Sequence, residues 1–221
     1  MNKFLFSLSA LFVACATFSV AQAQEVKGDA KAGEKKIAMC IGCHGIAGYQ
    51  ASFPEIHKVP KISGQGAKYI VSALTAYKKG ERKHPTMRGV ADNLSDQDMA
   101  DLGAYYEGHG KVEGFVLPAK AADGSARATE LVKKGACVSC HGENFSMPTV
   151  PSYPKIAGQY SDYLYVALKA YKTEGNPQVG RANAVMGGVV KQFSNAELKE
   201  LAAYVGGLPG ELKTVPQGKF R

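Results

Sequence analysis

The chain repeats itself once, and this duplication limits its fold more than any other feature. Four sequence blocks recur in the same order after about one hundred residues, a spacing much longer than that of a solenoid repeat. The pairs of blocks are 40–44 with 137–141, 60–65 with 154–159, 69–78 with 163–172, and 94–98 with 193–197. The pattern therefore predicts two copies of one domain.

The segment between the copies has the composition of a linker. Residues 107–122 are rich in Gly, Lys and Ala and include Pro118. We expect an N-terminal domain over residues 24–106, a linker over 107–122 and a C-terminal domain over 123–221. Domains of this size lie close to the limit at which an apolar core alone stabilises a fold.

Both copies have the same helical pattern. Residues 31–39 predict a short helix that runs directly into the first Cys motif, and residues 69–79 and 163–172 carry apolar side chains at helical spacing. The last helix of each copy starts with a capping-box pattern, Ser95 with Asp98 and Ser194 with Glu197. Its expected apolar face carries Leu102 and Tyr105 in the first copy, and Leu201 and Tyr204 in the second. No long stretch alternates like a strand, so the predicted class is all-α, with two tandem helical domains.

The N-terminus has the pattern of an export signal. Lys3 precedes an apolar run over residues 4–18, and Ala21-Gln22-Ala23 offers a small-residue cleavage site. The run is too short to predict a membrane span. Cys15 would carry lipid in a lipoprotein, but Phe12 fits that signal poorly. We expect residues 1–23 to be removed as a signal peptide during export to the periplasm.

The charge of the chain limits its partners. The net charge is +8, and no run of five or more like charges occurs. A moderate positive charge suits docking onto an acidic protein surface, because it speeds the encounter. The sequence has neither a basic stripe nor a nucleic-acid-binding motif, so we expect protein partners and no nucleic acid.

The chemistry is carried by two Cys-x-x-Cys-His motifs, which contain all four cysteines that follow residue 23. Two thiols at this spacing can add to the two vinyl groups of one porphyrin, and the next histidine then lies beneath the iron. The motifs predict two covalently bound heme c groups. Their thioether bonds would be made by Cys40, Cys43, Cys137 and Cys140, and their first iron ligands would be His44 and His141.

Two other uses of Cys-x-x-Cys pairs fit less well. A thioredoxin-like redox disulfide should open a helix that follows a strand, and no such strand is predicted. Structural zinc sites usually combine two pairs separated by about 15–20 residues, which is far less than the spacing found here.

Methionine is the predicted second axial ligand of each iron. Met87 and Met186 follow His44 and His141 by 43 and 45 residues, and each is expected in a loop eight residues before a capping Ser. The other histidines fail the symmetry test, since His84, for example, aligns with Asn183. A thioether ligand raises the reduction potential and fills the position where oxygen or peroxide would bind. This ligand set predicts an electron carrier and not an enzyme.

Two prolines, Pro60 and Pro154, follow the Cys motifs at similar distances. A ligating histidine normally donates its other ring N–H to a carbonyl or carboxylate. The carbonyls of these prolines could serve as acceptors, or both prolines could be ordinary turn residues.

At these residues the chain resembles the cytochrome c4 family, whose members are diheme class I c-type cytochromes. The resemblance covers both Cys motifs, both Pro-Lys-Ile-x-Gly-Gln segments, both Met segments and both terminal helices. It implies that each domain has a cytochrome c fold, in which the helix before the Cys motif crosses the last helix. It also implies that the Pro60 and Pro154 carbonyls accept from His44 and His141. The chain departs from the family in lacking Trp and in placing His84 near the first Met.

The resemblance further implies a function. Family members carry electrons in the periplasm, often toward terminal cytochrome c oxidases. The leading hypothesis is therefore a freely diffusing or loosely membrane-associated carrier between an electron donor and a terminal oxidase. The alternative is a cytochrome subunit of a periplasmic dehydrogenase complex. A diheme peroxidase would need an open iron site, which two symmetric methionines argue against.

Overall fold

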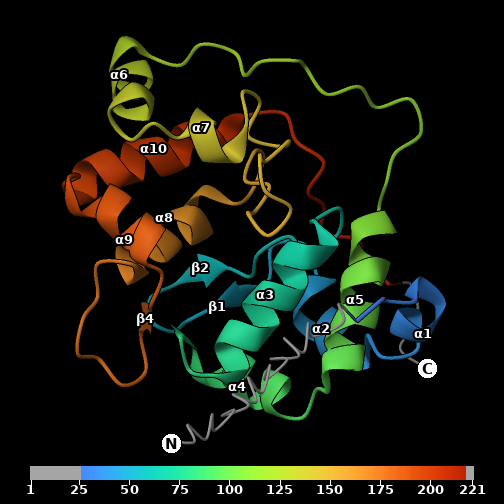
Figure 1. The fold of residues 1–221 in the computed structure, drawn as a ribbon. Helices are drawn as coiled ribbons and strands as arrows, with labels where there is room; N and C mark the ends of the chain where they lie inside the picture. Colours follow the sequence, from blue (N-terminus) through green and yellow to red (C-terminus); the bar gives the residue numbers. More distant parts are fainter. Residues whose placement is uncertain (1–25, 218–221) are drawn as a thin grey trace, which may run out of the picture.

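The computed structural model describes residues 26–217, which form two helical domains (Figure 1). The predicted signal peptide and Cys15 lie outside the described residues. Within the described part of the chain, no helix is long and apolar enough to cross a membrane. The predicted all-α class with two tandem domains is confirmed.

The first domain is built from α1 (Ala30–Glu34), α2 (Ala38–His44), α3 (Ala67–Lys78), α4 (Pro85–Asp92) and α5 (Asp96–Gly108). Helices α1 and α3 pack against α5, and the short strands β1 (Gln50–Ala51) and β2 (His57–Lys58) pair antiparallel beside them. The expected single helix over residues 31–39 is wrong. The chain turns after Glu34, and the Cys motif lies in the separate helix α2.

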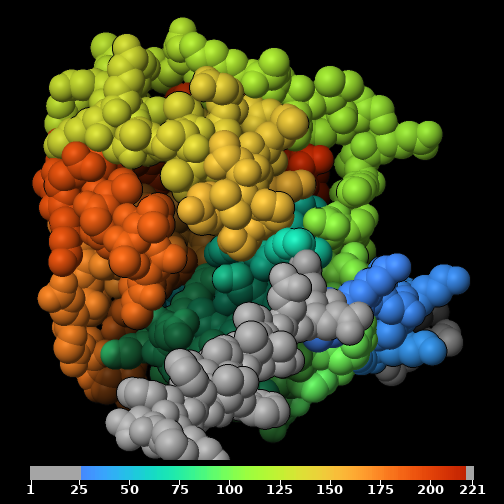
Figure 2. All heavy atoms as spheres, in the orientation of Figure 1, coloured from blue at the N-terminus to red at the C-terminus, as the bar shows by residue number. Residues whose placement is uncertain are grey.

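The second domain repeats this plan with α6 (Ala126–Lys134), α7 (Val138–His141), α8 (Ser161–Ala170), α9 (Ala184–Lys191) and α10 (Asn195–Gly207). Helices α6 and α8 pack against α10. The core of this domain includes Leu131, Leu198, Phe193 and Leu201, all buried. Between the domains, residues 109–125 contain no helix or strand and run along the outside of the molecule from α5 to α6 (Figures 1 and 2).

Both predicted capping boxes are present. The Ser95 hydroxyl accepts from the Asp98 N–H while the Asp98 carboxylate accepts from the Ser95 N–H, and Ser194 and Glu197 do the same. The expected apolar faces are only half correct. Leu102 and Leu201 are buried, but the side chains buried one turn further on are Tyr106 and Val205, one residue beyond the tyrosines named from the sequence. Each of these side chains lies four residues after the leucine, and residues four apart share one face of a helix.

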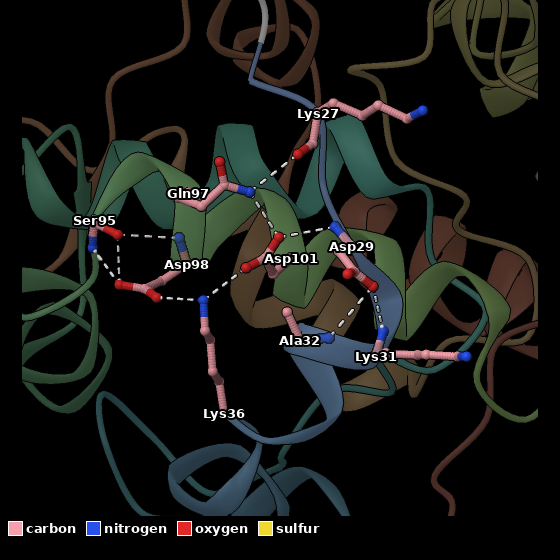
Figure 3. Close-up of polar contacts among 9 residues, drawn as sticks. All are labelled: Lys27, Asp29, Lys31, Ala32, Lys36, Ser95, Gln97, Asp98 and Asp101. Atoms are coloured by element: carbon pink, nitrogen blue, oxygen red, sulfur yellow. Dashed lines mark hydrogen bonds and ion pairs between the residues drawn. The ribbon is translucent and has the colours of Figure 1, made fainter.

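Helix α1 packs across α5, the crossing that the family resemblance implied, and a polar network holds the two together (Figure 3). Asp101 on α5 is 2% exposed and accepts from the Lys36 ammonium at 2.6 Å and from the Asp29 N–H at 2.8 Å. Lys36 also pairs with Asp98 at 2.6 Å. The helices cross closely, since a Cβ on Gly33 would lie 2.2 Å from the Asp101 carbonyl oxygen.

The two domains share a continuous interface, which the sequence patterns did not predict. Strand β3 (Arg82–Lys83) of the first domain pairs antiparallel with β4 (Gly180–Arg181) of the second. The chain beyond α10 then returns to the first domain, where the Lys213 N–H donates to the Ser63 carbonyl at 2.9 Å. In Figure 2 the gold and orange atoms of the second domain lie directly against the teal atoms of the first.

Candidate functional site

The first Cys-x-x-Cys-His motif lies on α2, which ends at His44. The His44 Nδ1 lies 2.8 Å from the Pro60 carbonyl oxygen. A carbonyl can only accept, so Nδ1 carries the proton and donates, and the Nε2 lone pair remains available for a metal. The carbonyl role implied for Pro60 is therefore present in the structure.

The second motif has the same geometry in a shorter helix. Cys137 precedes α7, and Cys140 and His141 lie within it. His141 is 8% exposed, and its Nδ1 donates to the Pro154 carbonyl at 3.0 Å. Each motif thus holds a histidine in the orientation and tautomer that a metal ligand requires.

The pKa values of the histidines and cysteines in the two motifs favour covalent heme attachment over a redox disulfide. Burial is the main cause of a lowered pKa at His44 and at His141, which keeps both rings neutral and able to ligate. Burial raises the pKa of the Cys40 thiol and raises that of Cys137 to about 11. Cysteines that exchange disulfides have a lowered pKa, so the redox-disulfide alternative loses support.

The zinc alternative also finds no support in the geometry. The two Cys pairs belong to different domains, on α2 and at α7. Over residues 26–217, no group of three or more His, Cys, Asp or Glu side chains is arranged to hold a metal ion. None of the four cysteines forms a disulfide in this part of the chain.

Met87 and Met186 occupy equivalent places, although the expectation that they lie in loops is wrong. Each lies in the first turn of a short helix, α4 or α9. These helices form because both are capped. The His84 Nδ1 accepts from the Met87 N–H at 3.4 Å, and the Asn183 Oδ1 accepts from the Met186 N–H at 2.9 Å. Pro85 at the start of α4 also favours the helix.

His84, the rival ligand in the first domain, has a structural role of its own. It is the N-cap of α4, as Asn183 is of α9, so its Nδ1 is already engaged as an acceptor. Its ring also contacts Phe53 edge-on, with centroids 5.8 Å apart. The sequence alignment of His84 with Asn183 therefore reflects a shared capping function, and this favours Met87 as the ligand.

Two arginines from the paired strands β3 and β4 form a positively charged site at the interface. Arg82 donates to the Tyr163 hydroxyl at 2.7 Å and to the Tyr69 hydroxyl at 3.3 Å, and Arg181 donates to Tyr163 at 3.2 Å. The Arg82 Nε is buried without a partner. Across residues 26–217, no carboxylate forms an ion pair with either guanidinium, although buried cations normally have such a partner.

The two arginine charges are strong enough to change the pKa of the Tyr163 phenol. Burial alone would raise its pKa, but the charges of Arg82 and Arg181 outweigh burial and lower the pKa to about 8. The charge of Arg82 also contributes to the lowered pKa of His44, which places it near the first motif. A group that carries carboxylates would neutralise this site, and heme carries two propionates. Thiols, neutral imidazoles, thioethers and arginines together fit a bound heme in each domain.

Sequence reasoning missed these arginines, although a signal was present. Arg82 precedes Met87 by five residues, and Arg181 precedes Met186 by the same five. The tyrosines they contact also belong to the recurring block at 69–78 and 163–172. Because an arginine and a tyrosine recur at equivalent places in both copies, the sequence could have predicted a positively charged site in each domain.

Comparisons with known proteins agree with this geometry. The sequence model of the cytochrome c family matches residues 30–108 and again residues 125–209. Cytochrome c4 of Stutzerimonas stutzeri is 32% identical over 224 residues, which cover 94% of this chain and 100% of that protein. The thiosulfate dehydrogenase electron acceptor of S. stutzeri strain A1501 is 30% identical over 83% of this chain and 87% of its own length. The crystal structure of reduced cytochrome c4 from Pseudomonas stutzeri superimposes with a TM-score of 0.59 at 30% identity, covering 82% of this chain and 100% of that one.

Proposed function

This chain belongs to the cytochrome c4 family of diheme electron carriers, and from that premise we propose that it carries electrons in the periplasm toward a terminal cytochrome c oxidase. It binds two covalent heme c groups, as family members do. When bound, each heme accepts and releases one electron. The protein's part is to hold each iron in a fixed ligand field and to exclude other reactions.

We assign one heme to each domain, with domain limits of 24–106 and 123–221 and a linker over 107–122. In the first domain Cys40 and Cys43 would form the thioethers, and His44 and Met87 would ligate the iron. In the second domain the same roles fall to Cys137, Cys140, His141 and Met186. Arg82 and Arg181 would neutralise heme carboxylates near the interface.

The observation that carries this assignment is the matched pair of histidine hydrogen bonds. His44 and His141 each donate from Nδ1 to a proline carbonyl, at 2.8 and 3.0 Å. Each ring therefore has a fixed orientation and a free Nε2. The duplicated Met at the start of a capped helix completes a ligand set that leaves no open position for a substrate, which favours a carrier over an enzyme.

The carrier role is tested by reoxidation. The exported, reduced protein would be mixed with membrane vesicles that contain the terminal oxidases of its host. We expect rapid oxidation of both hemes that cyanide abolishes. Slow oxidation that cyanide leaves unchanged would reject the oxidase as the acceptor.

A second candidate function is that of electron acceptor for a dehydrogenase. It is favoured by the relative named thiosulfate dehydrogenase electron acceptor, which matches 83% of this chain. The native protein would be purified through a tag and examined for a stoichiometric dehydrogenase partner. A partner that reduces both hemes when supplied with its substrate would favour this role, whereas a chain that purifies alone favours the free carrier.

A further inference from the structure

Two glutamine side chains cross the domain interface in a reciprocal arrangement. The Gln159 amide donates to the Lys61 carbonyl at 2.9 Å, and its Oε1 accepts from the Lys61 N–H at 2.9 Å. The Gln65 amide makes the same pair of bonds with Lys155, also at 2.9 Å each. Both glutamines are 4% exposed.

Each glutamine is bonded to the peptide group that orients the other domain's histidine. The Lys61 N–H and the Pro60 carbonyl belong to one peptide group, and that carbonyl accepts from His44. In the same way, Gln65 bonds the peptide group of Lys155, whose Pro154 carbonyl accepts from His141. Two hydrogen bonds therefore connect each histidine to a glutamine of the opposite domain.

Such a chain of hydrogen bonds has an electronic consequence. A peptide group whose N–H is hydrogen-bonded has a more polarised carbonyl, because successive bonds polarise one another. A stronger acceptor at Nδ1 makes the ligating imidazole more basic. A more basic ligand stabilises the oxidised iron, and hydrogen bonding around a cofactor is one of the means by which a protein sets its potential.

We propose that Gln159 lowers the reduction potential of the heme in the first domain, and that Gln65 lowers that of the heme in the second. Both are positioning residues that act across the interface, through the peptide groups 60–61 and 154–155. The proposal rests on the assignment of His44 and His141 as iron ligands.

The geometry goes beyond what interface packing alone requires. Each Oε1 also accepts from the backbone N–H of the next residue, Gly66 or Tyr160, at 3.0 Å. The amide is thus held from both sides, and its orientation is determined by its donors and acceptors. A glutamine that only filled space would not need to bond both polar groups of a single partner residue.

The test compares Gln159→Leu with Gln65→Leu in the heme-loaded, full-length protein. Spectroelectrochemical titration measures both potentials, and Met87→His and Met186→His assign each wave to its heme. We expect Gln159→Leu to raise the potential of the first heme selectively, and Gln65→Leu that of the second. In the reduced protein, the NMR signal of the affected histidine Nδ1–H should move upfield, because its hydrogen bond weakens.

Gln217→Leu is the matched control. Its amide also reaches out of the second domain, with Nε2 lying 3.4 Å from the Nε2 of His109 at the end of α5, but it bonds neither of the two peptide groups. This substitution should leave both potentials unchanged. Should a leucine variant not accumulate, Gln159→Asn and Gln65→Asn shorten the side chain with less disturbance and should produce smaller shifts of the same sign.

Three results would overturn the proposal: each variant shifts the heme of its own domain, both hemes shift equally, or neither heme shifts. A failure of the ligand assignment looks different. In that case Met87→His and Met186→His would not move separate waves, whatever the glutamine variants do.

Discussion

The two domains carry matching candidate ligands but hold their crossed helices together by different means. In the first domain the buried carboxylate of Asp101 joins α5 to Lys36 and to the Asp29 N–H. In the second domain the crossing of α6 and α10 has an apolar core that includes Leu131 and Leu198, both 0% exposed.

The ion pairs of the second crossing are more exposed. Arg127, whose side chain is 50% exposed, pairs with Glu197 at 2.8 Å. Exposed pairs of this kind contribute little to stability, whereas a buried, hydrogen-bonded carboxylate is costly to disturb. The histidine, methionine and cysteine positions, in contrast, coincide in both copies. The cofactor thus constrains the residues around it, while the helix crossing only requires that each buried polar group has a hydrogen-bond or charge partner.

The largest expected effect comes from substitutions in the apolar cores, which test whether both domains depend on their cores to the same extent. Met99 and Leu198 occupy matching places on α5 and α10 and are 1% and 0% exposed. Replacing either by Ala should lower the free energy of unfolding by about 2–5 kcal/mol, because the substitution leaves a cavity. Denaturant titration would measure this for each domain through its heme spectrum. A loss confined to Leu198→Ala would show that the first domain does not depend on its apolar core.

The next prediction concerns the polar crossing itself. Asp101→Asn should lower the Tm of the first domain by several degrees, because it leaves Lys36 without its buried partner. The matched control is Glu200→Gln, since Glu200 lies at the equivalent place and, among residues 26–217, makes only an exposed contact of 3.4 Å with Ser125. That variant should change the Tm little. Equal losses in calorimetry would remove the distinction between the two crossings.

A smaller effect is expected on acidification. A hydrogen bond from Lys36 is the main cause of a lowered pKa at Asp98 and at Asp101, and the bond from the Ser194 N–H is the main cause at Glu197. A carboxyl whose pKa is lowered by folding adds stability above its unfolded pKa of about 4, and this stability is lost as the pH falls through the folded pKa. Burial would raise the pKa of Asp162 in the second domain, but bonds from Lys58 and Tyr163 lower it. Since Lys58 belongs to the first domain, protonating Asp162 weakens the interface that both domains share. Below about pH 4 the first domain, with two such groups on one lysine, should therefore lose stability more steeply.

The measurement is an acid titration of the unfolding free energy for each domain. Lys36→Met should remove the excess slope of the first domain, because both carboxyls lose the same partner. The second domain should be unaffected by this substitution. Identical slopes for both wild-type domains would contradict the prediction.

Sequence patterns predicted the features that depend on neighbouring residues. The capping boxes at Ser95 and Ser194 and the burial of Leu102 and Leu201 arise from spacings of three or four residues. The loop expected at Met87 was wrong because the capping role of His84 was not recognised.

The interface could not be predicted in this way. The bonds from Gln159 to Lys61 and from Lys213 to Ser63 join residues far apart in the chain, and they depend on how one domain is placed on the other. No local pattern encodes that placement. The recurrence of a Gln at the end of both Pro-Lys-Ile-x-Gly-Gln segments was visible, but its role appears only when the two segments lie side by side.

The central claim, one His/Met-ligated heme in each domain, is tested most directly by the near-infrared sulfur-to-iron absorption of the ferric protein. Met87→Ala should remove about half of this band and open only the first heme to carbon monoxide after reduction, since a thioether no longer fills that position. Met186→Ala should do the same for the second heme, and both variants should keep their covalent hemes. If His84→Ala changes the spectrum of the first heme while Met87→Ala leaves the band intact, the claim is contradicted for that domain.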